Sequence, residues 1–333
     1  MVRALVKTAR EDLTIGRRRS GTGWSYRAAD GAVISDSANK ARIQALGIPP
    51  AWRDVRIAPH PRAHIQALGT DEAGRIQYIY HPDWEVKRTG KKLERLSLLT
   101  VALPRLRRRV QQDLTAETGS QKLALAIAVA MIDRTAMRVG REKYLETSGT
   151  RGAGTLFSRD VTVSQDEVCM AFDAKGGKKA RYCVTDARLA DAVTRIKTLP
   201  GKRLLVFRNA DGKMSAIRTS AINQYLREIA GVQIAAKDFR TLHASALAGE
   251  ALAKLELGAS VSARKRQMAQ VAREVSEFLR NTPMICRKSY IAPCLFKLFD
   301  EGRLGTLWSS TARIKPGLKQ REQRLGAVLA RLS

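Results

Sequence analysis

The sequence predicts an α+β protein: a small β-rich N-terminal domain followed by a larger, mainly helical domain that carries a β-hairpin. The chain has 333 residues, more than one compact core usually holds, so two domains are expected. Its hydrophobic content of 44% allows a packed core in each domain. Short alternating patterns dominate the start of the chain and helical patterns the rest. We therefore place the β-rich domain at residues 1–87 and the helical domain at residues 88–333.

Strand and turn patterns fill the N-terminal domain. Alternating residues flank the turn Asp30-Gly31, and two further strands flank a turn at residues 71–74. Side chains alternate along a strand, so Tyr78 and Tyr80 should share one face of the last strand. Beside Gln77, these rings suit contacts to a sugar-phosphate backbone or base edges. Packing against a small core is an equal alternative.

The chain then turns helical. Residues 88–92, which are basic and contain glycine, suit a linker or hinge. Residues 93–112 alternate leucines with arginines and predict an amphipathic helix with a cationic face. Residues 120–141 are almost wholly apolar and predict a central buried helix. Arg138 stands at the end of this helix, shortly before Gly140, so the helix should hold its guanidinium in a fixed position. The alternative is that Arg138 only caps the C-terminal end of the helix dipole.

A β-hairpin is the strongest local prediction in the second domain. Two alternating strand patterns flank Gly176-Gly177, which favours a tight turn. Lys175 stands at the lip of this turn. A lysine at a hairpin tip is usually a solvated charge, and the functional alternative is an acid that reaches a leaving oxygen.

Two helical segments precede the C-terminal motif. Arg240 stands where a helix is expected to begin, so its guanidinium and the helix N-terminus could both face an anion. Residues 262–280 then form an amphipathic stretch whose apolar stripe, including Phe278, should pack in the core.

Residues 281–290 form a motif that begins with Asn281 and ends with Tyr290. The tyrosine follows Arg287 and Lys288. Cationic neighbours favour the phenolate form of a tyrosine, and a phenolate can attack phosphorus. A half-buried packing tyrosine with solvated basic neighbours is the alternative.

The charge of the chain indicates a polyanionic partner. The formal net charge is +29 at pH 7, spread along the whole sequence, and nucleic acid is the leading candidate. The longest apolar run, residues 123–132, is too short to span a membrane, and the first residues show no apolar signal core. We expect no membrane partner and a cytoplasmic, nucleoid-associated location.

The cysteines and histidines show no metal-binding pattern. Cys169, Cys183, Cys286 and Cys294 lack C-x-x-C pairing and metal-ligand spacing with histidine, so we expect reduced thiols and no metal site. No phosphate-binding loop of the G-x-x-x-x-G-K-[ST] type is present, and we expect neither a nucleotide nor another cofactor.

The order of these elements resembles the type IB DNA topoisomerases, in the short bacterial and poxvirus-like form. The resemblance covers nearly the whole chain. The matching stretches, in the correct order, are residues 69–81, 138–144, 172–175, 239–241 and 288–290.

This resemblance implies a role for each site residue. Tyr290 would attack a phosphodiester of duplex DNA, leaving a 3′-phosphotyrosyl link and a free 5′-hydroxyl. Arg138 and Arg240 would hold the non-bridging oxygens, and Lys175 would protonate the departing 5′-oxygen. Asn281 stands where the family often carries histidine, and would donate an N–H to a non-bridging oxygen. Contacts to DNA are implied for Gln77, Tyr78, Tyr80, Lys143 and Tyr144.

The same resemblance implies two domains that clamp double-stranded, supercoiled DNA and relax it as a monomer, without ATP or metal. One alternative is a tyrosine site-specific recombinase, which shares the nucleophile. Recombinases usually place histidine three residues before the second arginine, where this chain has Lys237, and their N-terminal domain is typically helical. A second alternative is a non-catalytic nucleoid-binding protein, for which a charge of +29 suffices.

Overall fold

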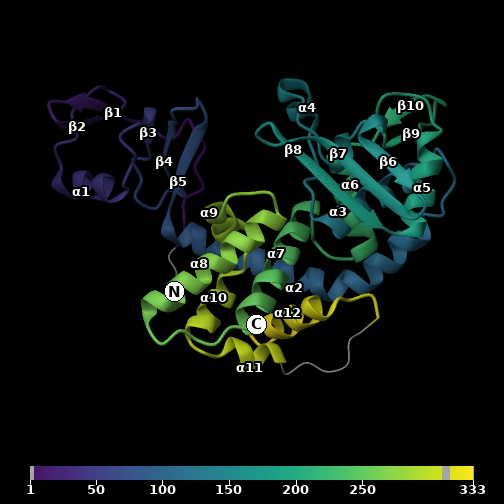
Figure 1. The fold of residues 1–333 in the computed structure, drawn as a ribbon. Helices are drawn as coiled ribbons and strands as arrows, with labels where there is room; N and C mark the ends of the chain where they lie inside the picture. Colours follow the sequence, from purple (N-terminus) through teal and green to yellow (C-terminus); the bar gives the residue numbers. More distant parts are fainter. Residues whose placement is uncertain (1–3, 310–315, 333) are drawn as a thin grey trace. The chain divides into compact units, whose positions relative to one another are not determined.

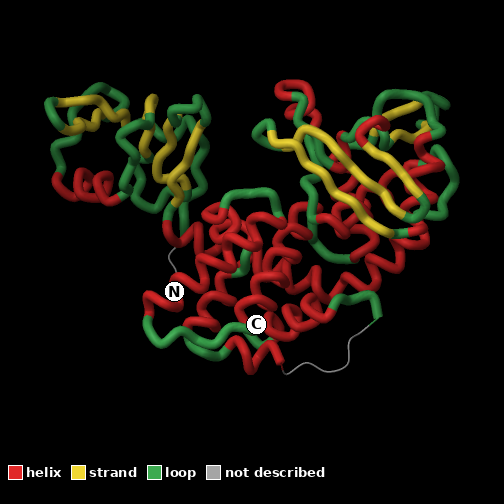
Figure 2. The backbone as a smooth tube through the Cα atoms, viewed as in Figure 1, coloured by secondary structure: helices red, strands yellow, loops and turns green. Residues whose placement is uncertain are grey.

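The computed structural model describes residues 4–309 and 316–332 and contains two compact units, Met1–Lys92 and Leu93–Ser333 (Figure 1). Strands and helices occur in both units, so the predicted α+β class is confirmed (Figure 2). Each unit has its own hydrophobic core. None of the described helices combines the length and apolar character that a membrane crossing requires.

The first unit is built on a five-stranded antiparallel sheet with the order β2-β1-β3-β4-β5. The predicted hairpin around residues 71–74 is confirmed as the β4–β5 pair. The sheet packs on one side against a short helix through Ile43 and Ile57. The bounds are β1 (Ile15–Ser20), β2 (Gly23–Arg27), α1 (Ser37–Ala45), β3 (Arg53–Ile57), β4 (Ile65–Thr70) and β5 (Ile76–Tyr80).

The predicted linker at residues 88–92 is wrong, because this stretch is helical. It lies inside α2 (Pro82–Asp113), which also contains the amphipathic helix predicted for residues 93–112. One glycine inside a helix costs only about 1 kcal/mol relative to alanine, and flanking arginines and lysines favour helix. The buried leucines Leu96, Leu99, Leu103 and Leu106 repeat at helical spacing and supply the packing that outweighs this cost.

Helix α3 (Gln121–Thr135) is the buried centre of the second unit. It begins at Ser120, whose hydroxyl accepts a hydrogen bond from the Leu123 amide, and twelve of its fifteen residues are buried. It contacts α5 (Ala187–Lys197), α6 (Thr219–Ala230) and α7 (Ala236–Ala253). The other helices are α4 (Glu142–Ser148), α8 (Val261–Phe278), α9 (Pro283–Ile285), α10 (Pro293–Asp300), α11 (Leu304–Ser309) and α12 (Gln320–Ala330).

The predicted hairpin around Gly176-Gly177 is confirmed, and it belongs to a three-stranded antiparallel sheet. The strands are β6 (Val161–Ser164), β7 (Glu167–Ala174) and β8 (Lys178–Thr185). Both glycines have left-handed φ values, +80° and +70°, which only glycine adopts without cost. Helix α5 packs against β7, and a separate two-stranded sheet is formed by β9 (Val206–Arg208) and β10 (Met214–Ala216).

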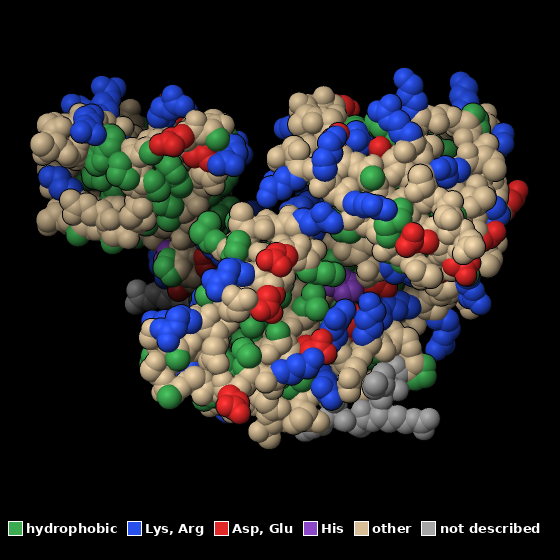
Figure 3. Space-filling view, viewed as in Figure 1, with side chains coloured by type: hydrophobic (Ala, Val, Ile, Leu, Met, Phe, Trp, Pro, Cys, Tyr) green, Lys and Arg blue, Asp and Glu red, His purple; other side chains and the backbone are tan. Residues whose placement is uncertain are grey.

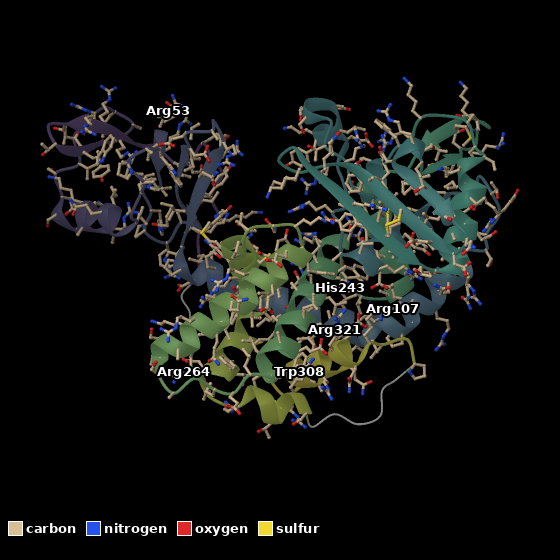
Figure 4. All side chains as sticks on the ribbon, viewed as in Figure 1. Arg53, Arg107, His243, Arg264, Trp308 and Arg321 are labelled. Carbon is tan, nitrogen blue, oxygen red and sulfur yellow. A yellow bond between two sulfur atoms is a disulfide. The ribbon has the colours of Figure 1, made fainter. Side chains whose placement is uncertain are left out.

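The expectation that all four cysteines are reduced thiols is wrong for one pair. Cys169 on β7 and Cys183 on β8 form a disulfide, visible as a yellow bond in Figure 4, whereas Cys286 is a free thiol. The two residues lie directly opposite each other in the hairpin, with their Cα atoms 4.1 Å apart. In such a cross-strand pair the two side chains face each other directly, which lets their sulfur atoms bond.

A buried ionic cluster ties α2, α3 and α12 together in the second unit. Arg107 donates to both carboxylate oxygens of Asp133, at 2.7 and 2.8 Å, and to both of Glu322, at 2.7 and 2.8 Å. His243 on α7 lies 3.6 Å from Asp133 (Figure 4). Burial alone would raise the pKa of Asp133 and of Glu322, but the Arg107 guanidinium holds the pKa of both carboxyls below the usual value.

Candidate active site

Tyr290 lies at the end of a single π turn, Cys286–Tyr290, that follows α9. The turn closes with a hydrogen bond of 3.0 Å from the Ile291 amide to the Cys286 carbonyl. Ser245 of α7 fixes its exit, because its hydroxyl donates to the Tyr290 carbonyl at 3.2 Å and accepts from the Ala292 amide at 3.0 Å. Isolated π turns are frequent at functional sites, since they redirect one side chain. Here the redirected side chain is the phenol of Tyr290.

Arg240 is buried, with 3% of its surface exposed, and its guanidinium lies 4.9 Å from the centre of the Tyr290 ring. One of its terminal nitrogens donates to the Leu279 carbonyl at 2.8 Å, and the other donates to the Ala136 carbonyl. These two carbonyls belong to the ends of α8 and α3. Arg240 therefore joins the segment that leads to Tyr290 to the helix end that precedes Arg138.

The predicted position of Arg240 at the start of a helix needs correction. Helix α7 begins at Ala236, so Arg240 lies in its second turn. The helix start is capped by Asp238, whose carboxylate accepts from the Ala235 amide at 2.9 Å. Arg240 therefore does not share an anion site with the helix N-terminus, contrary to what the sequence suggested.

Two helices of the site end in a residue with left-handed backbone conformation. Ala136 closes α3 with a φ of 54°, and Arg280 follows α8 with a φ of 50°. Each reverses the chain just before a predicted site residue, Arg138 or Asn281. Helix α3 consequently stops short of residue 141, the predicted end, and Arg138 projects from the segment beyond it.

Arg138 is half-buried, and close backbone packing fixes its segment. Its carbonyl accepts from the Ala153 amide at 2.9 Å, and a Cβ atom added to Gly152 would lie 2.4 Å from that carbonyl oxygen. Arg138 lies close enough to Arg240 and Tyr290 to interact electrostatically with both. Burial, followed by the Arg240 charge, lowers the pKa of Arg138 from its ordinary value.

The two arginines concentrate positive charge beside the tyrosine. Among the described residues, neither Arg138 nor Arg240 forms an ion pair with a carboxylate. Two partly desolvated cations without an anion favour binding of a negatively charged group such as a phosphodiester. The structure thus places the Arg240 guanidinium beside Tyr290, and Arg138 near enough to interact electrostatically with both.

Asn281 follows Arg280 directly and is half-buried. Its amide closes the end of α8 by donating to the Ser276 carbonyl at 2.9 Å. Its side-chain oxygen accepts from the Thr282 amide at 3.1 Å, and among the described residues its side-chain N–H groups form no hydrogen bond, so they remain as donors. This orientation fits an asparagine that donates to an oxygen of a bound phosphodiester.

Lys175 is exposed in the turn between β7 and β8, and the structure does not place it in contact with Tyr290. Within the described ranges it forms no ion pair or hydrogen bond. The body of the hairpin, in contrast, is fixed: Asp173 pairs with Arg151 at 3.3 Å, and the rings of Phe172 and Tyr182 stack at 6.1 Å. The turn that carries Lys175 projects from this fixed body.

The residues predicted to contact DNA in the second unit lie on the seven-residue helix α4. Lys143 and Tyr144 are both exposed, the latter to 52%, and the helix has no buried residue. An exposed aromatic side chain on a helix without a core face is available for a ligand.

In the first unit, Gln77 is committed to an internal contact. Its side-chain nitrogen donates to Asp71 at 2.8 Å, and Arg75 donates to the same carboxylate at 2.9 Å. The Arg75 hydrogen bonds hold the pKa of Asp71 at about 2. This small network fixes the β4–β5 turn and leaves the other N–H of Gln77 as a donor.

Tyr78 and Tyr80 lie on one face of β5, as predicted, with their rings stacked at 5.9 Å. Both rings are partly buried against a hydrophobic cluster that includes Ile65, so each ring takes part in the packing that was the alternative to DNA contact. Guanidinium groups lie over the rings, Arg10 5.5 Å from Tyr78 and Arg88 6.0 Å from Tyr80. Burial raises the pKa of Tyr80.

Two side chains near the site, Ser245 and Tyr182, could not be identified from the sequence. Ser245 bonds the Tyr290 carbonyl, 45 residues away, and the ring of Tyr182, at an ordinary strand position, meets Arg280 only after folding. Their positions depend on contacts distant in sequence, which periodicity and motif spacing do not contain.

Two family models match this chain in succession. Residues 23–71 match the N-terminal domain of bacterial DNA topoisomerase IB, and residues 82–293 match the catalytic core of eukaryotic DNA topoisomerase I. The fold and the arginine-tyrosine site therefore belong to an enzyme class that acts on DNA. The chain is a member of the DNA topoisomerase I family, in its type IB form.

Individual relatives agree with this assignment. DNA topoisomerase 1B of Acanthamoeba polyphaga mimivirus is 26% identical over 293 residues, which cover 86% of this chain and 87% of the relative. DNA topoisomerase 1B of vaccinia virus (strain Western Reserve) is 21% identical over 278 residues, covering 81% and 84%. A solved structure of the XerH site-specific recombinase bound to difH substrate, a pre-cleavage complex, is more distant: 18% identity, 72% and 59% coverage, and a TM-score of 0.36.

Proposed function

We propose that this protein relaxes positively and negatively supercoiled DNA by breaking and rejoining one strand through a covalent bond to Tyr290, without ATP or metal. The observation that carries the proposal is the position of Tyr290 beneath the Arg240 guanidinium, with Arg138 beside it and no carboxylate paired to either among the described residues. A cationic pocket around a phenol suits attack on a phosphodiester better than any other chemistry of these groups.

Cleavage is a single exchange at phosphorus. The phenolic oxygen of Tyr290 forms a bond to the phosphorus, and the bond from phosphorus to the 5′-oxygen breaks. The phenolic proton goes to solvent, and Lys175 gives a proton to the departing 5′-oxygen, which otherwise leaves as a poor alkoxide. Arg138, Arg240 and the Asn281 side chain donate to the non-bridging oxygens, whose negative charge grows as phosphorus becomes five-coordinate.

Religation is the reverse exchange. The 5′-hydroxyl attacks the phosphotyrosyl phosphorus, Lys175 takes back the proton, and Tyr290 leaves. The phosphotyrosyl bond conserves the energy of the phosphodiester that was broken, so no nucleotide is needed for resealing. Between the two steps, the free strand rotates and releases torsional energy already stored in the DNA.

Binding to duplex DNA rests on positive charge. Lys and Arg side chains lie over the hairpin sheet and the helices of the second unit (Figure 3), in a chain whose net charge is +29. Counterion release from the DNA then dominates affinity, which makes binding strongly dependent on salt. We assign further contacts to Lys143 and Tyr144 on α4 and to Gln77, Tyr78 and Tyr80 on β5. The protein would act as a monomer in the cytoplasm, on the nucleoid.

A plasmid assay tests the proposal. Negatively and positively supercoiled plasmids are incubated in EDTA without ATP, with the parent protein, Tyr290→Phe or Tyr26→Phe. Tyr26 is a buried core residue of the first unit and serves as the matched control for loss of one hydroxyl. The parent and Tyr26→Phe should relax both plasmids, and Tyr290→Phe should relax neither.

Two results would reject the proposal. Relaxation by Tyr290→Phe would exclude this tyrosine as the nucleophile. No relaxation by the parent, with DNA binding intact, would favour a recombinase that lacks its target site or a DNA-packaging protein. The β-rich first unit and Lys237 three residues before Arg240 both argue against the recombinase.

A further inference from the structure

Arg280 links two parts of the proposed site: the hairpin that carries Lys175 and the segment that carries Asn281 and Tyr290. We propose that Arg280 is a positioning residue that fastens the hairpin of Lys175 to the segment of Asn281 and Tyr290. This inference rests on the proposed function, because it assigns a role in the same strand-cleavage reaction. It adds a residue to the site that is neither a phosphate contact nor a proton donor.

The backbone of Arg280 is the first line of evidence. Its φ of 50° lies in the left-handed region, which disfavours every residue with a Cβ atom. It occupies the position after the end of α8 where glycine is the usual residue, because glycine adopts this conformation freely. In the described ranges only four residues other than glycine have a positive φ: Asp54, Ala136, Gln165 and Arg280. An arginine at such a position points to a function of its side chain.

The side chain is the second line of evidence. The Arg280 guanidinium lies 4.9 Å from the centre of the Tyr182 ring, and one of its nitrogens donates to the Arg181 carbonyl at 2.5 Å. Both partners belong to β8, and Arg181 lies 99 residues before Arg280 in the chain. The residue directly before Asn281 is thus bound to the second strand of the hairpin.

Tyr182 transmits this attachment to the rest of the hairpin. Its ring stacks on Phe172 of β7, at 6.1 Å, so both strands are held at this level. Phe172 is buried in the core of the second unit and stands three residues before Lys175. Tyr182 also lies within electrostatic range of Arg138, one of the two arginines proposed to bind the phosphate.

The distance from anchor to tip explains why the attachment matters. Tyr182 stands four residue steps from Lys178 at the turn, and at about 3.3 Å per step the turn lies about 13 Å beyond the ring that Arg280 holds. A tilt of about 5° at the anchor would therefore shift the Lys175 turn by about 1 Å. A displacement of about 1 Å can slow an enzymatic step by about 100-fold when a group must meet a reacting atom.

Arg280→Gly is the variant that isolates the side chain. Glycine keeps the left-handed backbone, so the path of the chain into Asn281 is preserved. Arg273→Ala is the matched control for charge, because Arg273 lies exposed on α8 and its guanidinium, among the described residues, forms hydrogen bonds only to Gln270. Tyr182→Ala removes the other side of the anchor, and Tyr182→Phe keeps the ring.

The readout is single-turnover cleavage of two DNA duplexes by these full-length proteins. One duplex has the natural 5′-oxygen at the cleaved bond, and the other has sulfur there. Thiols ionise at a pH of about 8.5, so a thiolate leaves without a proton from Lys175. Arg280→Gly should cleave the oxygen duplex about 10- to 100-fold more slowly than the parent and the sulfur duplex within about threefold of it.

The other variants sharpen this expectation. Tyr182→Ala should reproduce the pattern of Arg280→Gly, and the double variant should be no slower than the slower single variant, because both break one contact. Tyr182→Phe and Arg273→Ala should match the parent on both duplexes. Arg280→Gly should melt at the same temperature as the parent or higher, since it removes an unfavourable backbone conformation; a purely structural role predicts a lower melting temperature.

Three results would overturn the inference. Arg280→Gly could cleave the oxygen duplex at the parental rate. It could slow both duplexes equally, which would place its effect on Asn281 or Tyr290 instead of the hairpin. It could weaken DNA affinity well beyond Arg273→Ala and recover full rate at saturating protein, which would make it a DNA contact. Tyr290→Phe is run in parallel as the variant without the proposed nucleophile. If the parent protein forms no covalent complex with DNA, the proposed function is rejected. If the parent cleaves normally and any of these three results is obtained, only the role of Arg280 is rejected.

Discussion

Arg240 and Lys175 belong to the same proposed reaction but are held in opposite ways. Arg240 is 3% exposed, and its guanidinium is hydrogen-bonded to the ends of two helices and lies over the tyrosine ring. Lys175 is exposed in a turn of the hairpin and, within the described ranges, has no ion pair or hydrogen bond. One residue is part of the core, and the other extends from the surface.

The difference follows from what each group must do. A group that stabilises charge on non-bridging oxygens is most effective when it is already in place, because no reorganisation is then needed during the reaction. A proton donor acts on one oxygen, which moves away after cleavage and returns for religation. A solvent-exposed lysine can follow that oxygen and exchange its proton. Loss of Arg240 should therefore lower both activity and stability, whereas loss of Lys175 should lower activity alone.

Loss of Arg240 should have the largest effect. Arg240→Ala should slow cleavage by about 1,000-fold, the upper end of what removal of one oxyanion donor costs in other enzymes. It should also lower the free energy of unfolding by about 2–4 kcal/mol, because the buried carbonyls of Ala136 and Leu279 lose their donor. Single-turnover cleavage and urea unfolding measure the two effects. Arg240→Ala with parental stability would contradict this expectation.

Loss of Lys175 should affect the reaction alone. Lys175→Ala should slow cleavage by about 100- to 10,000-fold, the range for loss of a general acid. Its free energy of unfolding should change by no more than about 0.5 kcal/mol, since the side chain is exposed. Lys178→Ala, an exposed lysine at the start of β8, is the control and should cleave at nearly the parental rate. Equal slowing of both variants would show that the hairpin supplies only general positive charge.

The buried ionic cluster of Arg107, Asp133 and Glu322 should contribute strongly to the stability of the second unit. Arg107→Met leaves the carboxylates of Asp133 and Glu322 buried without their partner, and should lower the free energy of unfolding by about 3–5 kcal/mol at neutral pH. Arg108→Met, at the next and exposed position of α2, should change it by no more than about 0.5 kcal/mol.

The pH dependence of this cluster has a defined sign. The pKa of Asp133 and that of Glu322 are held below their ordinary values of 3.8 and 4.5, so their contribution is fully present above about 4.5 and is lost as the pH falls. The stability difference between the parent and Arg107→Met should therefore shrink below a pH of about 4.5. Urea unfolding at neutral and acidic pH measures it, and a constant difference would contradict the assignment.

Much of this molecule could be predicted from its sequence, because the relevant signals are local. The pair Gly176-Gly177 marks a hairpin since each glycine takes a conformation that other residues avoid. Apolar periodicity revealed α2, α3 and α8. Phe278, expected in the core, is instead 39% exposed because α8 ends there and the chain turns away.

The unpredicted features depend on tertiary contacts. Ala136 ends α3 in a left-handed conformation for which alanine has no preference, so the helix end could not be read from the residue type. Arg240 was expected at a helix start, yet Asp238 caps that helix and places Arg240 one turn further. The Cys169–Cys183 disulfide, in contrast, could have been predicted from the sequence. The hairpin register pairs Ala174 with Lys178, and equal steps away from the turn along both strands bring the two cysteines opposite each other.

The most direct measurement is the chemical identity of the covalent DNA complex. The protein is mixed with supercoiled plasmid, stopped with denaturing detergent, digested with protease and nuclease, and analysed by mass spectrometry. We predict a peptide in which Tyr290 carries the 3′-phosphate of one DNA strand, together with a cleaved strand that ends in a free 5′-hydroxyl. A link through the 5′-phosphate, attachment to another residue, or no covalent peptide would contradict the account.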